Sequence, residues 1–170
     1  MQHDHLDKVL QQWQQTRPDL DPQPMAVVGR VLRLAGLLEQ RANAALQPFG
    51  LAVWGFDVLG TLRRQGKPYS LTPTELMKAT VLSSGAMTNR IDRLEKLGLV
   101  QRTPHDRDRR SLQVNLTAKG LRVVDQAAVA RFEEAQEALQ GMPTAEQTSL
   151  ARWLRKILIQ LEPEPDGPLG

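Results

Sequence analysis

The sequence predicts a mainly α-helical chain with one small β-hairpin, which is an α+β fold. Apolar residues recur at spacings of three and four over most of the chain, as they do on one face of a helix. Only residues 99–116 change to the shorter period of strands. Proline or glycine stands between most of the periodic segments, so the expected helices are separate elements. With 170 residues, 41% of them hydrophobic, the chain can form one domain with appendages.

Three helices are expected first. A helix over His3–Thr16 is predicted because one face carries, at spacings of four, three and four, Leu6, Leu10, Trp13 and Arg17. Three prolines within residues 17–24 end it. A long amphipathic helix then covers Met25–Leu46, and its apolar positions are Val28, Leu32, Ala35, Leu38, Ala42 and Leu46. After a break at residues 48–50, a third helix runs from residue 51 to about Arg64.

A loop and two shorter helices follow. Residues 65–70 are expected to form the loop. Residues 72–75, with a threonine cap, a proline at the first helical position and a glutamate at the third, begin a helix. Residues 81–84 interrupt it, and a serine there caps the next helix. That helix runs to about Leu97 and stops at Gly98.

Two helices are expected at the C-terminal end. Thr117 caps the first, which ends before a Gly-Met-Pro break. Thr144 with Gln147 caps the second, an amphipathic helix that ends near Leu161. The proline-rich, acidic tail at residues 163–170 is predicted to be disordered.

Charge and composition exclude several classes of protein. There is no cysteine, so disulfides, thiolate nucleophiles and cysteine-based redox switches are excluded. No apolar run reaches the length of a membrane span, and the polar N-terminus resembles neither a signal nor a transit peptide, so we expect a cytoplasmic protein. Residues 61–119 carry 12 Lys and Arg against 5 Asp and Glu, although the whole chain is only +3. This basic middle favours a polyanionic partner.

Strands are expected at residues 99–100 and 112–116, on either side of an arginine-rich tip. With the two helices before it, this hairpin completes the order helix, tight turn, helix, hairpin over residues 72–116. That order describes a winged helix-turn-helix, whose second helix enters the major groove of DNA.

The second helix has the two faces that this role requires. Its apolar face, which can dock on the core, consists of Met87, Ile91, Leu94 and Leu97. Its other sides carry short polar side chains that suit hydrogen bonds to bases or phosphates, together with Asp92. The DNA-contacting residues predicted here are Ser83, Ser84, Gly85, Thr88, Asn89 and Arg93. Asn89 and Arg93 are the two expected at or near base edges.

The hairpin tip carries three arginines interleaved with two aspartates, in the order His105, Asp106, Arg107, Asp108, Arg109 and Arg110. Alone, such a charge run is equally consistent with a solvated turn. After a helix-turn-helix pattern, it favours arginines that enter a narrow A·T-rich minor groove. We therefore predict DNA contacts from Arg107, Arg109 and Arg110.

Residues 71–120 closely resemble the MarR family of bacterial winged-helix regulators. The most characteristic parts are DRLEKLGLV (92–100) and the D-x-R…LT run of the wing, which is Asp108, Arg110, Leu116 and Thr117. The resemblance covers roughly Met25–Leu161. It implies an obligate homodimer with interlocked first and last long helices, a pseudo-palindromic operator, and a small ligand, often a phenolic or aromatic acid, that weakens DNA binding. The apolar faces of the long helices, which exceed what one small domain can cover, agree with a dimer.

The expected organisation has five parts. Residues 1–17 form an appended helix, and residues 18–50 a linker and the first dimerisation helix. Residues 51–119 form the winged helix-turn-helix domain. Residues 120–162 hold the C-terminal dimerisation helices, and residues 163–170 are the disordered tail.

A lone carboxylate, Asp57, stands in the apolar stretch FGLAVWGFDVLG, where it is costly unless something pairs with it. The appended helix is similar to that of the MarR branch that includes urate-responsive repressors. This resemblance implies a ligand site at Trp13, Arg17, Asp57 and Arg90. An indole and a guanidinium on one helix face can address a flat anionic heterocycle. A ligand that competes for Arg90 could then shift the recognition helix.

Simpler interpretations stay open for each of these residues. Trp13 can be a hydrophobic anchor, and Arg17 a cation favoured by the helix dipole. Asp57 and Arg90 can form a structural ion pair without any ligand. The effector itself is left open among urate, related purines, nicotinate-like acids and phenolics.

Other function classes fit less well. The histidines lie near the terminus or on the hairpin tip, and no nucleophile has an obvious base, so an enzyme with a catalytic site is not expected. The segment 3–5 (His-Asp-His) is too local for a metal site, and no cofactor is expected. A helical dimer that binds only protein is disfavoured by the arginines at 93, 107, 109 and 110. We expect a homodimeric DNA-binding regulator that acts as a ligand-released repressor.

Overall fold

The computed structural model describes residues 3–80, 84–104 and 112–162. Within them lie α1 (His5–Thr16), α2 (Gln23–Leu46), the 3-10 turn η1 (Gln47–Phe49), α3 (Val53–Arg64), β1 (Ser70–Leu71), α4 (Pro73–Thr80), α5 (Ser84–Lys96), β2 (Val100–Pro104), β3 (Leu112–Leu116), α6 (Ala118–Ala138) and α7 (Thr144–Leu161). The chain divides into two compact units, Met1–Glu134 and Ala135–Gly170. The mainly helical α+β prediction is confirmed. No described helix is long and apolar enough to cross a membrane.

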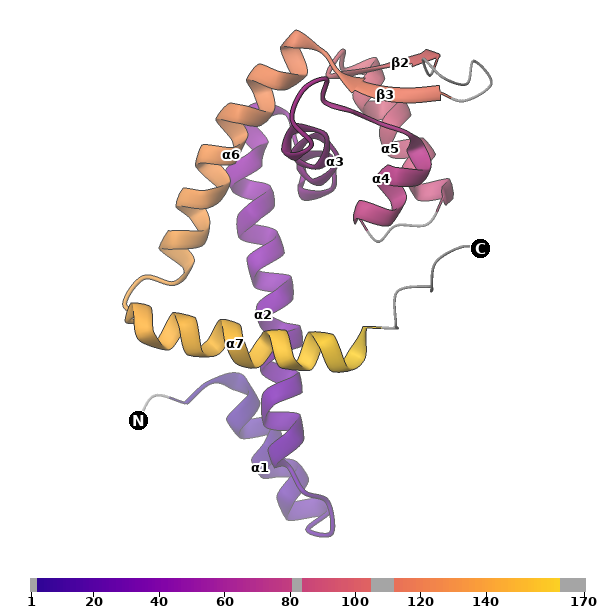
Figure 1. The fold of residues 1–170 in the computed structure, drawn as a ribbon. Coiled ribbons are helices and arrows are strands. Elements are labelled where there is room, and N and C mark those ends of the chain that lie inside the picture. The colour runs from indigo at the N-terminus through magenta and orange to yellow at the C-terminus, as the bar shows by residue number, and fades with distance from the viewer. Residues whose placement is uncertain (1–2, 81–83, 105–111, 163–170) are drawn as a thin grey trace. The chain divides into compact units, whose positions relative to one another are not determined.

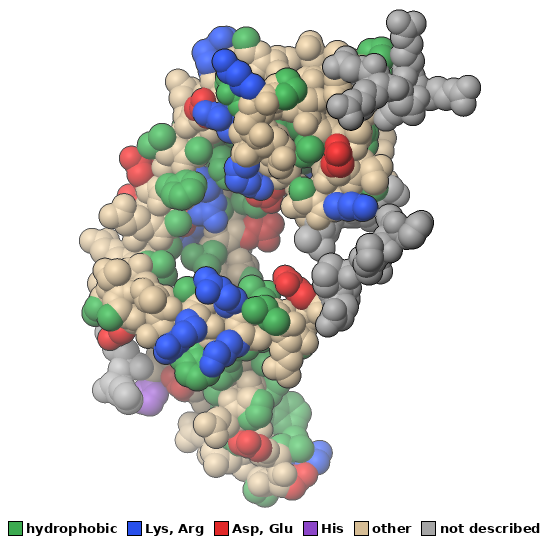
Figure 2. Space-filling model, in the orientation of Figure 1, with side chains coloured by type: hydrophobic (Ala, Val, Ile, Leu, Met, Phe, Trp, Pro, Cys, Tyr) green, Lys and Arg blue, Asp and Glu red, His purple; other side chains and the backbone are tan. Residues whose placement is uncertain are grey.

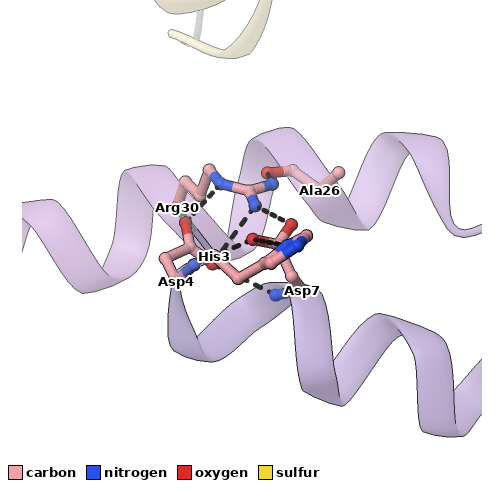
Figure 3. A network of polar contacts seen from close by, with 5 residues as sticks. All are labelled: His3, Asp4, Asp7, Ala26 and Arg30. Atoms are coloured by element: carbon pink, nitrogen blue, oxygen red, sulfur yellow. Dashed lines mark hydrogen bonds and ion pairs between the residues drawn. The ribbon is translucent and has the colours of Figure 1, made fainter. Parts of the chain in front are cut away.

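Helix α1 is held against the first half of α2 by one arginine. A capping box begins α1, because Asp4 and Asp7 each accept a hydrogen bond from the other's backbone N–H. The guanidinium of Arg30 on α2 then donates to Asp4 and to Asp7, each at 2.7 Å (Figure 3). The hydrogen bond from Arg30 is the main cause that lowers the pKa of Asp4, whereas the pKa of Asp7 is lowered first by the Asp4 backbone N–H and then by Arg30. Beside them, the side chain of Leu6 packs so closely on Gly29 that a Cβ there would lie 2.9 Å from it.

The core lies where α3, α4, α5 and the sheet meet (Figure 1). Helix α3 supplies three side chains with no solvent exposure, Val58, Leu59 and Leu62. Its first turn has no cap of its own, and Asn43 on α2 instead accepts the Val53 N–H at 2.9 Å. The C-terminal half of α2 therefore orients the start of α3 through a polar contact.

The start of α4 and the end of α5 are largely as predicted. The Thr72 N–H donates to the Glu75 carboxylate at 2.7 Å, and the Thr72 hydroxyl accepts the Glu75 N–H, so the predicted capping box is formed. A serine within residues 81–84 was predicted to cap α5; the helix begins at Ser84, and the residue before it, Ser83, lies outside the described residues. After α5, Gly98 adopts a left-handed conformation with φ of 70°, which ends the helix as expected.

One residue of the predicted docking face of α5 is misplaced. Met87, Ile91 and Leu94 are buried, but the side chain of Leu97 is 48% exposed. The prediction failed there because the helix ends at Lys96 and the chain turns at Gly98. Leu99, which follows the turn, enters the core instead.

The sheet has three strands in the order β1-β3-β2, one more than the predicted hairpin. Strands β2 and β3 pair antiparallel from Val100↔Leu116 to Pro104↔Leu112, as the hairpin requires. The extra strand is the two-residue β1, which pairs Ser70 with Asn115. Sequence reasoning assigned this segment to a loop, because two residues are too few to show an alternation.

Thr117 begins α6 as predicted, and it also fastens the helix to the hairpin. Its hydroxyl accepts the Gly120 N–H at 2.9 Å and donates to the Gly98 carbonyl at 2.7 Å. A Cβ at position 120 would lie 1.9 Å from the carbonyl oxygen of Leu99, so only glycine fits. The start of α6 is thereby held against the end of the α5 turn.

Helix α7 begins one residue earlier than predicted. Its N-cap is Pro143, and Thr144 is its first helical residue. No side chain caps the start of this helix. The predicted pairing of Thr144 with Gln147 is therefore wrong. The Gln147 amide instead donates to the carbonyl of Met142 at 2.9 Å and stabilises the turn before the helix.

Candidate nucleic-acid interface and effector site

Helix α5 presents a polar, exposed face opposite its buried side. Gly85, Thr88, Asn89 and Arg93 are exposed, at the spacings of one helix face. Ser84 is the first residue of the helix, and Ser83 lies outside the described residues. An α-helix of 13 residues carries partial positive charge at its N-terminus, which favours a phosphate there.

The wing can be described at its base only. The predicted contacts Arg107, Arg109 and Arg110 lie outside the described residues. At the base, Arg102 on β2 joins the hairpin to α5, because its guanidinium donates to Asp92 at 2.5 Å and to Glu95 at 2.6 Å.

The same arginine makes a third bond, since its backbone N–H donates to Glu95 at 2.9 Å. Burial alone would lower the pKa of Arg102, but the hydrogen bonds to the two carboxylates raise it. Sequence reasoning missed this contact. The available signal was an acidic pair three residues apart, Asp92 and Glu95, beside a strand that contains one arginine.

A tryptophan of α3 meets two arginines of α5. The Cζ atoms of Arg90 and Arg93 lie 5.9 Å and 5.5 Å from the centre of the Trp54 ring. Both distances are within the range of cation–π attraction. Trp54 was also missed, because within FGLAVWGFDVLG it had been assigned to the apolar background.

Asp57 has no ion pair or hydrogen bond with another described residue, although it was predicted to need a partner. Partial burial raises the pKa of its carboxyl group, and Arg90, Arg64 and Arg131 oppose that rise through their charges. Its side chain keeps access to solvent. Asp57 is thus a carboxylate that faces positive charge without being neutralised by contact.

Arg131 belongs to a second network that joins α6 to α2. Glu134, the one buried charged residue among those described, accepts from Arg131 at 2.7 Å and from Arg41 at 2.9 Å. The surroundings of Asp57 therefore extend from α5 to α6.

Trp13 and Arg17 lie elsewhere in the chain. Trp13 is 55% exposed and lines an apolar pocket of about 280 Å³. The other lining residues are Leu6, Val9, Leu10, Leu20, Asp21, Pro22 and Met25. Arg17 donates to Asp19 at 2.6 Å and 2.8 Å, outside that lining. Leu6, Leu10 and Trp13 of the predicted helix face line this pocket, but Arg17, the fourth predicted member, lies past the end of α1 at Thr16.

Within one chain, the four predicted ligand-site residues form two separate pairs. Trp13 shares its pocket with Met25 at the start of α2, whereas α3 is attached at Asn43. A helix rises 1.5 Å per residue, so these points on α2 are about 27 Å apart. Arg90 is close enough to Asp57 for its charge to oppose the rise that burial causes in the pKa of Asp57.

Comparison with known proteins gives a consistent answer. A profile of the MarR family matches residues 49–111. The HTH-type transcriptional regulator PecS of Dickeya dadantii is 33% identical, over 89% of this chain and 92% of PecS. A crystal structure of a mutant MarR from Escherichia coli complexed with operator DNA has a TM-score of 0.70 at 26% identity, covering 86% of this chain and 97% of that one. AbsC, a MarR family regulator from Streptomyces coelicolor, has a TM-score of 0.75 at 25% identity, with 84% and 96% covered.

Proposed function

Because this chain belongs to the MarR family of transcriptional regulators, we propose that it is a cytoplasmic homodimeric repressor of a pseudo-palindromic DNA operator. Like its relatives, it is a transcriptional regulator and not an enzyme. The observation that carries the proposal is the geometry of α5. Three buried side chains hold the helix on the core, and the opposite face offers Thr88, Asn89 and Arg93 to solvent. Amide and guanidinium groups are those that read base edges in the major groove.

Exposed apolar side chains on the long helices support the dimer. On α2, Leu32 is 69% exposed, and six further leucines and valines from residue 27 to residue 38 are also open to solvent. On α7, apolar and basic side chains both reach the surface (Figure 2), and Ile159 is 68% exposed. A soluble monomer rarely leaves such continuous apolar faces uncovered, and a second copy of the chain would cover them.

The effector part of the proposal centres on Asp57 and Arg90. A carboxylate with a raised pKa beside three guanidinium groups is a site that a flat molecule with N–H donors and an anionic edge can occupy. Urate, related purines and aromatic acids share this chemistry. Such a ligand would compete for Arg90, which lies on the recognition helix.

Trp13 and Arg17 can join that site only from a second copy of the chain. Within one chain they lie too far from Asp57 for a single small molecule to touch both pairs. We therefore place them in the proposed site as a contribution of the partner's appended helix.

A selection experiment tests the DNA-binding function. The purified chain is used to enrich duplexes from a random-sequence pool, and binding of the selected duplex is measured at several salt concentrations. We expect a pseudo-palindrome, with affinity that falls by about 1000-fold or more between roughly 50 and 200 mM salt. Failure to enrich any sequence, or binding that is insensitive to salt, would contradict the proposal.

A thermal-shift screen tests the effector. Flat aromatic acids and purines are added to the parent chain and to Asp57→Asn. A compound that stabilises only the parent chain, and that also releases the selected duplex, identifies the class of ligand.

A further inference from the structure

Trp54 lies where α3 meets the recognition helix, and no role has been assigned to it. We propose that Trp54 is a positioning residue: its ring holds Arg93 ready for DNA and, by holding Arg90 as well, links the proposed effector site to the DNA-binding face. The inference rests on the proposed function, since it concerns how α5 binds an operator.

The geometry of the contact supports this role. Trp54 is half-buried on α3, and Asp57 follows it by one helical turn. On α5, Arg90 and Arg93 are likewise one turn apart, and both guanidinium centres lie within 6 Å of the same ring. The helices pack closely here, because Gly55 is buried and a Cβ on it would touch Leu94 at 3.6 Å.

The contact with Trp54 leaves Arg93 able to bind DNA. A guanidinium held near an aromatic ring by cation–π attraction keeps its N–H donors, which project in its own plane. Arg93 is exposed, so these donors can still reach a phosphate or a base edge. The ring therefore reduces the number of conformations that Arg93 must lose on binding, without occupying its donors.

Arg90 connects the same ring to the effector site. Its charge acts on Asp57, and its guanidinium lies against Trp54. A ligand that draws Arg90 towards Asp57 would remove one of the two arginine contacts that hold α5 on this ring. Because Arg93 is on the same rigid helix, the change reaches the DNA-binding face.

Fluorinated tryptophan separates the charge of the ring from its shape. The chain has three tryptophans, so the double variant Trp13→Phe/Trp153→Phe leaves Trp54 as the sole indole. This variant is produced with tryptophan, 5-fluorotryptophan and more highly fluorinated analogues, which weaken the negative face of the ring stepwise. Affinity for the duplex selected by the parent chain should fall stepwise, by about 2- to 5-fold in total, as expected for loss of an exposed cation–π contact.

Two matched controls accompany the series. In Trp54→Phe, fluorine enters only positions 13 and 153, and the affinity should not change along the series. In the sole-Trp54 chain with Arg93→Met, the stepwise loss should become smaller, because only the Arg90 contact with the ring is left. An affinity that is flat or rises as the Trp54 ring is fluorinated would overturn the inference, while DNA binding by the parent chain would leave the proposed function intact.

A second measurement does not depend on DNA. The fluorine NMR signal of 5-fluorotryptophan at position 54 should shift when Arg93 is changed to Met, because the guanidinium lies over that ring. An unchanged signal would overturn the contact itself, even if no operator duplex were enriched.

Discussion

At the scale of single residues, Asp57 differs most from its expectation. Its apolar neighbours predicted a buried carboxylate with a direct partner, yet it has access to solvent and touches no arginine among the described residues. Partial burial still disfavours its charge more than three surrounding arginines favour it. A side chain whose ionised form costs stability is a reasonable candidate for a binding function.

This cost can be measured as a pH-dependent stability difference. The pKa of Asp57 in the folded chain lies above its ordinary value of 3.8, so the folded state holds the proton more tightly than the unfolded state does. Its contribution to stability therefore falls as pH rises through 3.8 and the raised pKa. We expect Asp57→Asn to raise the thermal midpoint by about 1–3 °C at neutral pH, with no gain below pH 3.8. Equal midpoints at neutral pH would show that the carboxylate is not disfavoured.

Effector release is a separate prediction at the same scale. Asp57→Asn and Trp13→Ala should each retain the DNA footprint but need about 10-fold or more ligand for release, since each removes one contact to the ligand. Lys8→Ala, an exposed change on the same helix as Trp13, serves as the control. If both variants release DNA at the ligand concentration that the parent chain needs, neither residue belongs to the site.

At the scale of elements, Arg102 determines how the wing is attached to the recognition helix. Its three bonds to Asp92 and Glu95 join β2 to α5, and the side chain is only 23% exposed. One guanidinium therefore contributes two of the bonds that hold the base of the hairpin on α5.

Removing that guanidinium should loosen the wing without unfolding the core. We expect Arg102→Ala to lower stability by about 1–2 kcal/mol, because two partly exposed carboxylates lose their partner. In hydrogen exchange, the amides of β2 and β3 should lose protection, whereas those of α3 should not. If the amides of β2 and β3 are protected as well in Arg102→Ala as in the parent chain, the role given to Arg102 is contradicted.

Most elements were predictable because their signals are local. The capping box at Thr72 and the glycine stop at Gly98 need only neighbouring residues, and both are formed. The contacts of Trp54 and Arg102 were not predictable, since each joins residues of different elements whose mutual placement no local pattern specifies. The separation of Trp13 from Asp57 was not predictable for the same reason. A resemblance identified both residues, but the distance between them depends on where α1 packs.

At the scale of the whole molecule, charge and apolar surface are segregated. The basic residues concentrate between positions 61 and 119, the segment that contains α4, α5 and the hairpin. Of the exposed large apolar side chains among the described residues, only Leu97 and Leu112 lie within that segment, and most of the others lie on α2, α6 and α7. This division suits a protein that meets DNA with its middle and a second copy of itself with its long helices.

The central claim, that the exposed face of α5 reads the operator, is tested most directly by repeating the duplex selection with Asn89→Ala. An amide bidentate to adenine contributes about 1–3 kcal/mol of discrimination at one base pair. The variant should therefore bind the parent's duplex about 10- to 100-fold more weakly, and one symmetric pair of operator positions should lose its preference. Lys8→Ala should change neither. If Asn89→Ala selects the same sequence with the same affinity as the parent chain, α5 is not the element that reads DNA.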